Sequence, residues 1–181
     1  MMAVLVERPV GSSVVPFYQS GGSLIHPKVV MTAAHSIAGI NPLNLVVRGG
    51  EWDTQSEKEM CKHVERKVER VITHEQFVRK NLRNDIALLV LEDEFELTPF
   101  INTVCLPPKG MNFDNRRCLS GGWGKNKFGK AGIHQVFLKK TDLPIVPNAE
   151  CQNKLRKTRL GADFKLHDGF LCAGEKYFLN R

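Results

Sequence analysis

Short apolar runs separated by turn residues recur along the first half of the chain. They are rich in Val, Ile and Leu and are bounded by Gly, Pro, Asn or Asp, which is typical of β-strands. Residues 67–73 alternate charged and apolar side chains, which predicts a half-buried strand, whereas the continuous run at 86–91 predicts a strand buried on both faces. The predicted strands lie at 3–6, 14–19, 24–25, 29–33, 45–48, 67–73 and 86–91, with turns at 9–13 and 26–28.

A proline-containing connector at 95–108 separates this part from a second half with fewer apolar runs. Asn148 is predicted to cap a helix that ends before Gly161. Many short strands with one late helix favour an all-β fold built as a pair of barrels. The elements predicted for the second half are strands at 118–124 and 135–146, the latter interrupted by Pro144, and a helix at 149–160.

Composition adds limits to this picture. The 181 residues are 42% hydrophobic and 25% charged, which is ordinary for a globular protein. The apolar opening at 1–6 is too short for a signal peptide and ends at Glu7. No segment approaches membrane-spanning length, so we expect no membrane partner.

The net charge of +7 is unevenly distributed. Between Arg116 and Lys165 there are twelve Lys or Arg residues and three acidic ones. Such a bias favours acidic partners, and sulfated glycans bound through Lys125–Lys165 are one candidate. A solvated basic surface without a ligand is the alternative. No RNP, zinc-finger or helix-turn-helix pattern accompanies the charge, so nucleic acid is not an expected partner.

The five cysteines form no CxxC pair, so their spacing fits no zinc site, and we expect no metal and no cofactor. An odd number suggests an unpaired thiol or a partner elsewhere, and the cysteine content fits an oxidising compartment. The cysteines are Cys61, Cys105, Cys118, Cys151 and Cys172.

Candidate chemistry centres on His35, which follows the predicted strand at 29–33. An imidazole held at the end of a buried strand can be fixed in one orientation, as a general base must be. Asp85 comes 50 residues later and opens the apolar run at 86–91. Its carboxylate would lie at the edge of a core and need a donor such as His35. A histidine and an aspartate with purely structural roles are the alternative.

Other motifs match known sites only in part. Ser120-Gly121-Gly122 lacks the Gly-Asp that precedes a protease nucleophile, and Ser23 lies in a predicted strand, so both are interpreted as structural. Residues 124–131 resemble a phosphate-binding loop but carry Ala131 in place of the magnesium-ligating Ser or Thr. Residues 74–78 begin like a zinc-protease motif but lack its second histidine.

Taken together, GGSLI at 21–25, TAAH at 32–35 and DIALL at 85–89 resemble a trypsin-like (chymotrypsin-fold) serine protease domain. The likeness narrows to the insect clip-domain serine protease homologues, which resemble prophenoloxidase-activating factors. This resemblance implies a chymotrypsin-like double Greek-key β-barrel with residues 1–104 as first barrel and 105–181 as a partial second barrel. It also implies catalytic roles for His35 and Asp85, in the order that the serine protease triad follows in this fold. The segments carrying the likeness to the clip-domain group are 50–53, 73–77, 105–108 and 143–147.

The chain also departs from the family pattern. The Gly-Asp-Ser-Gly-Gly segment with the nucleophile does not follow Cys172-Ala173-Gly174, so the catalytic pair is expected to be vestigial. The resemblance further implies that the first strand, the activation segment and the C-terminal helix are missing. Ser20 and Ser36 stand where the family has a disulfide, usually worth about 2–4 kcal/mol.

The same resemblance implies a disulfide between Cys151 and Cys172. It implies that Cys105 and Cys118 would pair with cysteines outside the chain, and it offers no account of Cys61.

Three functional hypotheses follow. The first is a secreted, non-catalytic protease homologue that contacts proteases or prophenoloxidase-type substrates of an extracellular immune cascade. The second is a fragment of an active serine-type endopeptidase, and the third is a basic polyanion-binding module. A chain lacking the last strands of a barrel should also expose strand edges and associate readily.

Overall fold

A computed structural model describes residues 1–56, 62–127 and 129–174, which divide into two compact units. The first unit comprises Met1–Leu106 and Gly122–Lys139, and the second comprises Pro107–Gly121 and the chain from Lys140 onward. Cys61 lies outside the described residues. No helix in the described ranges is long and apolar enough to cross a membrane.

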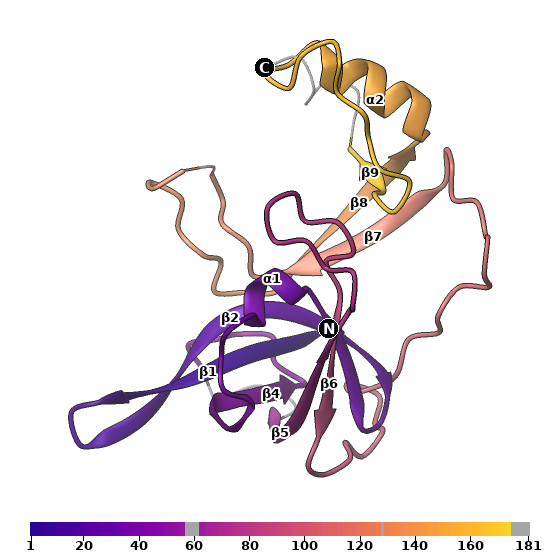
Figure 1. The fold of residues 1–181 in the computed structure, drawn as a ribbon. Coiled ribbons are helices and arrows are strands. Elements are labelled where there is room, and N and C mark those ends of the chain that lie inside the picture. Colours follow the sequence, from indigo (N-terminus) through magenta and orange to yellow (C-terminus); the bar gives the residue numbers. More distant parts are fainter. Residues whose placement is uncertain (57–61, 128, 175–181) are drawn as a thin grey trace. The chain divides into compact units, whose positions relative to one another are not determined.

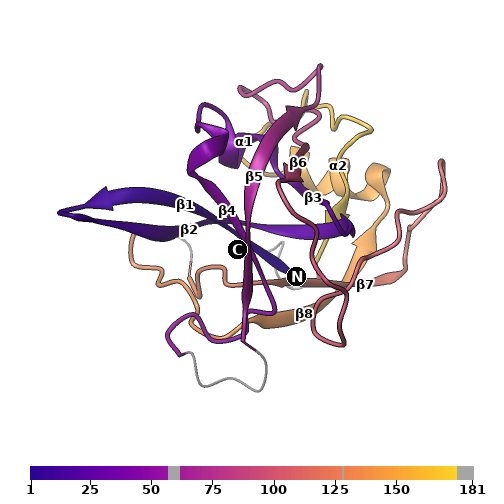
Figure 2. The same cartoon turned by 90° about the horizontal axis from the view of Figure 1, so that it is seen from below.

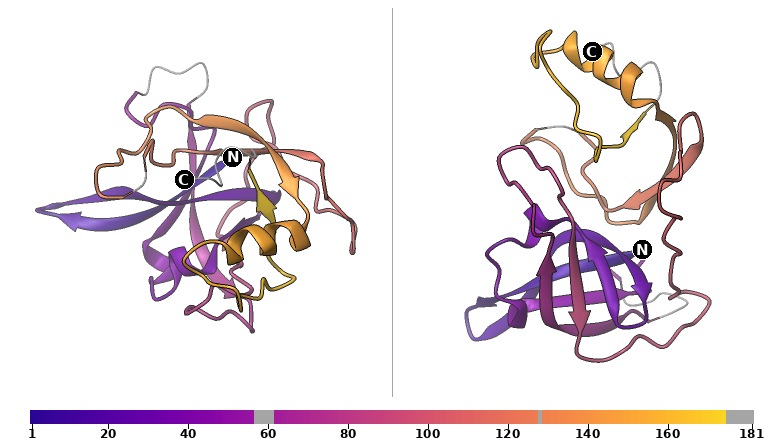
Figure 3. Two further views of the ribbon diagram at one scale, coloured as in Figure 1. Left: turned by 90° about the horizontal axis from the view of Figure 1, so that it is seen from above. Right: turned by 45° about the vertical axis from the view of Figure 1, so that its right-hand side comes forward.

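Six antiparallel strands close into a barrel in the first unit (Figures 1 and 3). Their order around the barrel is β1-β2-β3-β6-β5-β4. The seven strands predicted for this half overlap these six, because residues 14–19 and 24–25 belong to one long strand. Two of them end differently than predicted, since Ala33 lies outside β3 and Ile86 lies outside β6. The strands are β1 (Met2–Val10), β2 (Ser13–His26), β3 (Val29–Thr32), β4 (Leu45–Gly49), β5 (Val64–Thr73) and β6 (Ala87–Leu91).

The barrel encloses an apolar core to which every strand contributes. Strands β1, β4 and β6 contribute alternate residues, as the pleat of a strand dictates. Val4, Val30, Val47 and Leu89 are all 0% exposed. The prediction that residues 86–91 are buried on both faces is wrong in detail, because in β6 only alternate residues are buried and the residues between them are half-buried. One face of β6 therefore fills the core and the other is partly covered.

The predicted turn at 9–13 is also corrected. Strands β1 and β2 continue their pairing as far as Val10 and Ser13, so the turn contains only Gly11 and Ser12. Gly11 has a φ of 62°, which favours glycine. The hairpin extends beyond the barrel because β4 pairs with β1 only as far as Val6 (Figure 2). A proline, Pro9, is tolerated there because that edge has no further strand to pair with.

Residues 122–139 pack on the barrel although they follow the connector. Trp123 is 1% exposed and packs with Ala3, Leu5 and Val46. The predicted strand at 135–146 begins later than expected, since β8 spans Lys139–Val146. The preceding residues bond to the barrel unit instead, as when the Leu138 N–H donates to the Trp52 carbonyl at 2.8 Å.

The second unit contains a three-stranded sheet in the order β7-β8-β9, with β7 at Arg117–Gly122 and β9 at Cys172–Ala173. Helix α2 spans Asn148–Arg156, so it is shorter than predicted, and Pro147 rather than Asn148 is its N-cap. The helix ends early because tighter turns follow, with the Lys157 N–H donating to the Lys154 carbonyl at 3.1 Å.

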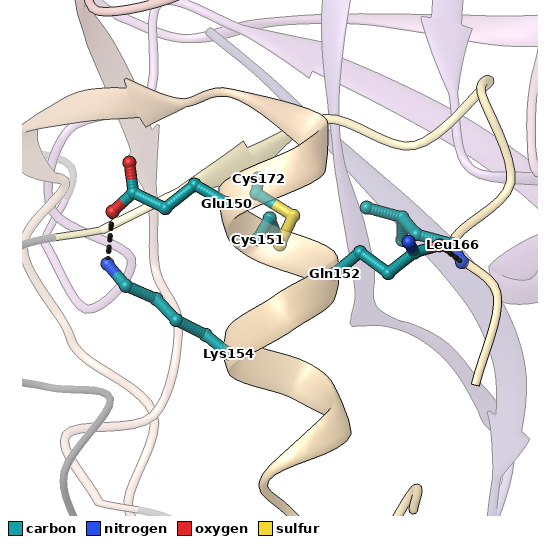
Figure 4. Close-up of a disulfide and its surroundings, with 6 residues drawn as sticks. All are labelled: Glu150, Cys151, Gln152, Lys154, Leu166 and Cys172. Carbon is teal, nitrogen blue, oxygen red and sulfur yellow. Dashed lines mark hydrogen bonds and ion pairs between the residues drawn. A yellow bond between two sulfur atoms is a disulfide. The ribbon is translucent and has the colours of Figure 1, made fainter. Parts of the chain in front are cut away.

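A disulfide joins Cys151 on α2 to Cys172 on β9, as the family resemblance implied (Figure 4). Two further contacts fix the helix. Lys154 pairs with Glu150 at 2.7 Å, and the Gln152 side chain accepts a hydrogen bond from the Leu166 N–H at 3.0 Å. The disulfide therefore connects the helix to the edge strand of the small sheet.

Candidate active site

The register between β3 and β6 brings the two predicted site residues together. The strands are antiparallel, and Thr32 at the end of β3 lies opposite Ala87 at the start of β6. His35 follows Thr32 by one turn of chain, and Asp85 precedes Ala87 by two residues. The end of one strand and the start of the other therefore meet at the same rim of the barrel.

The His35 and Asp85 side chains form a hydrogen-bonded pair. One carboxylate oxygen of Asp85 lies 2.5 Å from His35 Nδ1, and the other accepts the His35 backbone N–H at 2.7 Å. The Asp85 side chain is 18% exposed and the His35 side chain is 49% exposed. We assign the Nδ1 proton to the bond with the carboxylate, which leaves Nε2 as a proton acceptor that solutes can reach.

A short helix, α1 (Ala34–Ile37), fixes the histidine backbone. Ala34 is 0% and Ile37 2% exposed, and both belong to the barrel core. Small and aliphatic residues on either side of His35 therefore anchor the helix, while the imidazole itself faces outward. This helix was not among the predicted elements.

The loop before Asp85 has an unusual backbone. Leu82 and Asn84 have φ values of 56° and 54°, in the left-handed region that non-glycine residues seldom adopt. Asn84 Nδ2 donates to the Gln76 carbonyl at 3.0 Å, and the Ile86 N–H bonds back to the Asn84 carbonyl at 2.8 Å. These bonds hold Asp85 at the start of β6.

Two serines, Ser20 and Ser36, stand where the family resemblance implies a disulfide, and they make separate contacts. Ser20 Oγ lies 3.0 Å from Thr32 Oγ1, which itself donates to the Gly21 carbonyl. Ser36 Oγ lies 3.3 Å from His35 Nε2, and the Ser36 carbonyl accepts a bond from Gln19 Nε2 at 2.5 Å. Ser36 is thus the hydroxyl that contacts the free side of the imidazole.

The remaining candidates lie elsewhere. Ser23 is on β2 and Ser120 on β7, and among the described residues neither hydroxyl contacts a histidine or a carboxylate. His74 Nδ1 accepts the Gln76 N–H at 3.1 Å in a local turn. The residues at 124–131 extend over Phe128, which lies outside the described ranges.

The structure also contains a charged cluster that the sequence analysis missed. Glu51 is only 4% exposed, and Arg48 bonds to it at 2.8 Å and to Glu65 at 2.7 Å. Burial lowers the pKa of Arg48, but the hydrogen bonds to both carboxylates outweigh it and raise the pKa above its ordinary value. The pairing of β4 with β5 places Arg48 opposite Glu65, a register that spacing alone does not reveal.

Comparisons with known proteins give one matching family model and several similar relatives. The family model described as Trypsin matches residues 4–179. Phenoloxidase-activating factor 2 of Galleria mellonella is 47% identical over 96% of this chain, which spans 59% of that protein. Inactive CLIP domain-containing serine protease A28 of Anopheles gambiae is 41% identical over 85% of the chain and 39% of its own length. Serine protease filzig of Drosophila melanogaster is 35% identical over 85% of the chain and 9% of its own length.

Proposed function

Because this chain belongs to the trypsin family of serine proteases, we propose that it acts through contacts with other proteins rather than by cleaving them. The observation that carries the proposal is the likeness along most of the chain to a phenoloxidase-activating factor and to a relative whose name calls it inactive. The chain spans about three-fifths or less of these relatives, so the activity of the whole protein is part of the proposal.

The proposed setting is an extracellular proteolytic cascade of innate immunity. The partners are a protease of that cascade or a prophenoloxidase-type substrate, as the name of the Galleria relative suggests for that protein. In this role His35 and Asp85 are vestigial for peptide cleavage. The barrel still positions them, because the β3–β6 register holds them whether or not they act on a peptide.

The experiment compares the full-length protein with its His35→Ala variant. We expect both to hydrolyse peptide amides at the same background rate, and both to increase prophenoloxidase cleavage when added to a reconstituted cascade. Removing a working catalytic histidine lowers turnover by about 10⁴–10⁶. Peptide hydrolysis that His35→Ala abolishes would contradict the proposal.

A second candidate is a serine-type endopeptidase whose nucleophile lies outside residues 1–181. The observation that favours it is the His35–Asp85 contact at 2.5 Å, a geometry suited to a working general base. The transcript downstream of Arg181 distinguishes the two candidates. A Gly-Asp-Ser-Gly-Gly segment supports the enzyme, whereas Gly-Asp-Gly-Gly supports the homologue.

We also propose that sulfated glycans are a partner of the second unit. Lys157, Arg159 and Lys165 are exposed close to the end of α2. Exposed cations near one another favour a polyanion because each sulfate can contact more than one of them.

A further inference from the structure

The Ser36 hydroxyl lies on the free side of the His35 ring. The Ser36 Oγ to His35 Nε2 distance is 3.3 Å, and His35 Nδ1 bonds to Asp85 at 2.5 Å. Hydroxyl, imidazole and carboxylate therefore form a continuous relay within the barrel unit. Catalytic hydrogen bonds are often this long in free proteins and shorten when a substrate binds.

The backbone around Ser36 favours a fixed position for its hydroxyl. The Ser36 carbonyl accepts a bond from Gln19 on β2, and the Ser36 N–H bonds to the Ala33 carbonyl at 3.3 Å. The next residue, Ile37, is buried in the core. Ser36 is itself half-buried, and the adjacent His35 side chain is 49% exposed, so a small solute can reach the pair.

We propose that Ser36 is a nucleophile toward activated acyl and phosphoryl donors, with His35 as its general base. Asp85 acts as a positioning residue that holds the imidazole in the tautomer with a free Nε2. All three residues belong to the barrel unit. Attack on an activated donor does not require that the protein also cleaves peptides.

The transfer of the acyl or phosphoryl group to Ser36 needs no further reagent. His35 Nε2 removes the hydroxyl proton while Ser36 Oγ attacks the carbonyl carbon of an aryl ester or the phosphorus of a fluorophosphonate. The new bond joins Oγ to that carbon or phosphorus, and the bond to the phenolate or fluoride breaks with its electron pair. The proton passes from Nε2 to the phenolate or, in the second case, to solvent.

Ser20 provides a matched control for Ser36. It is the other serine at the family's disulfide positions, and its hydroxyl contacts Thr32 rather than a histidine. A hydroxyl without a nearby base has no means of losing its proton at neutral pH. Ser20→Ala should therefore leave the reaction unchanged.

The test treats the chain with a fluorophosphonate probe at neutral pH and maps the modified peptide by mass spectrometry. We expect one probe on Ser36 in the parent protein and in Ser20→Ala, and none at this peptide in Ser36→Ala. In His35→Gln the labelling rate at Ser36 should fall about 100-fold, since a general base contributes about 10²–10⁴. His35→Gln keeps the hydroxyl in place, so this arm does not depend on the folding of Ser36→Ala.

Three outcomes would overturn the proposal: no label, a label on another residue only, or a Ser36 labelling rate that His35→Gln does not change. The result is separable from the proposed protein-contact role. If only the Ser36 proposal holds, the probe labels Ser36 while peptide hydrolysis stays at the background rate. If the protein is a working protease, the probe also labels a serine that is not among residues 1–181.

Discussion

At the scale of single residues, the backbone of Asn84 decides where Asp85 lies. Asn84 has a φ of 54°, and its side chain bonds to the Gln76 carbonyl. In this left-handed conformation the Cβ of any residue except glycine crowds the following carbonyl oxygen. Asparagine offsets that cost better than alanine because its short polar side chain can hydrogen-bond locally. The loop therefore uses a residue whose backbone preference and side-chain bond both support the same conformation.

We predict that Asn84→Ala lowers the free energy of unfolding more than Asn84→Gly. Both variants lose the side-chain bond to Gln76, but glycine keeps the left-handed backbone without strain. The difference between the two should be about 1 kcal/mol, measured by urea unfolding. Equal destabilisation would show that the conformation at this position carries no cost for alanine.

The sequence predicts the residues of the site better than their contacts. His35 and Asp85 were identified from family motifs, and the structure brings their side chains together. The Ser36 contact with His35 Nε2 was not foreseen, because it depends on the backbone angles of α1. The charged cluster around the buried Glu51 was missed for a similar reason, since Glu65, the second partner of Arg48, lies on the paired strand β5.

At the scale of elements, strand β6 shows why a continuous apolar run is ambiguous. Leu88 and Leu89 are neighbours of the same residue type, yet Leu89 is 0% exposed and Leu88 is half-buried. Successive side chains of a strand point to opposite faces, and only one face of β6 lines the barrel core. The run itself could not show that the second face lacks a full cover.

We predict that Leu89→Ala destabilises the barrel by about 2–5 kcal/mol, because it leaves a cavity in a closed core. Leu88→Ala should cost less than half as much, because its side chain already meets solvent and leaves no enclosed cavity. Chemical unfolding of the two variants measures both values. Similar losses would mean that β6 is enclosed on both faces, as its sequence first indicated.

Element boundaries were the weaker part of the sequence prediction. Pro9 and Gly11 suggested a turn at 9–13, but β1 continues through Pro9 since no strand pairs with its outer edge there. Helix α2 stops at Arg156 because tight turns follow it, although no proline or glycine appears before Gly161. The first boundary is set by strand pairing and the second by i→i+3 bonds at the end of the helix, and residue types alone predict neither.

At the scale of the whole molecule, the surplus of positive charge bears on binding. The net charge is +7, and the segment between Arg116 and Lys165, with twelve basic and three acidic residues, accounts for all of this surplus. Net charge alone attracts any polyanion, and salt weakens that attraction. A specific binding site depends instead on particular cations. A charge-reversal experiment can separate these two contributions.

We predict that the chain is retained on heparin above about 0.5 M salt, where most surface electrostatic attraction is screened. A double variant, Lys157→Glu with Arg159→Glu, should elute near physiological salt. Arg79→Glu with Lys80→Glu changes the net charge by the same amount at an exposed position of the barrel unit and should elute later. Equal elution of the two double variants, or elution of the parent near physiological salt, would dismiss a glycan site near α2.

The alignment of Thr32 with Ala87 has a consequence for how this protein folds and diverges. His35 and Asp85 are separated by 50 positions, so their side chains meet only after β3 and β6 have paired. The histidine–aspartate contact therefore forms only when the chain between these strands has folded back. A slip of one position would turn the apolar side chains of β6 away from the core, and selection for stability opposes it. Proteins that evolve from this barrel would thus keep positions 35 and 85 close together, even where no catalytic role selects for the contact.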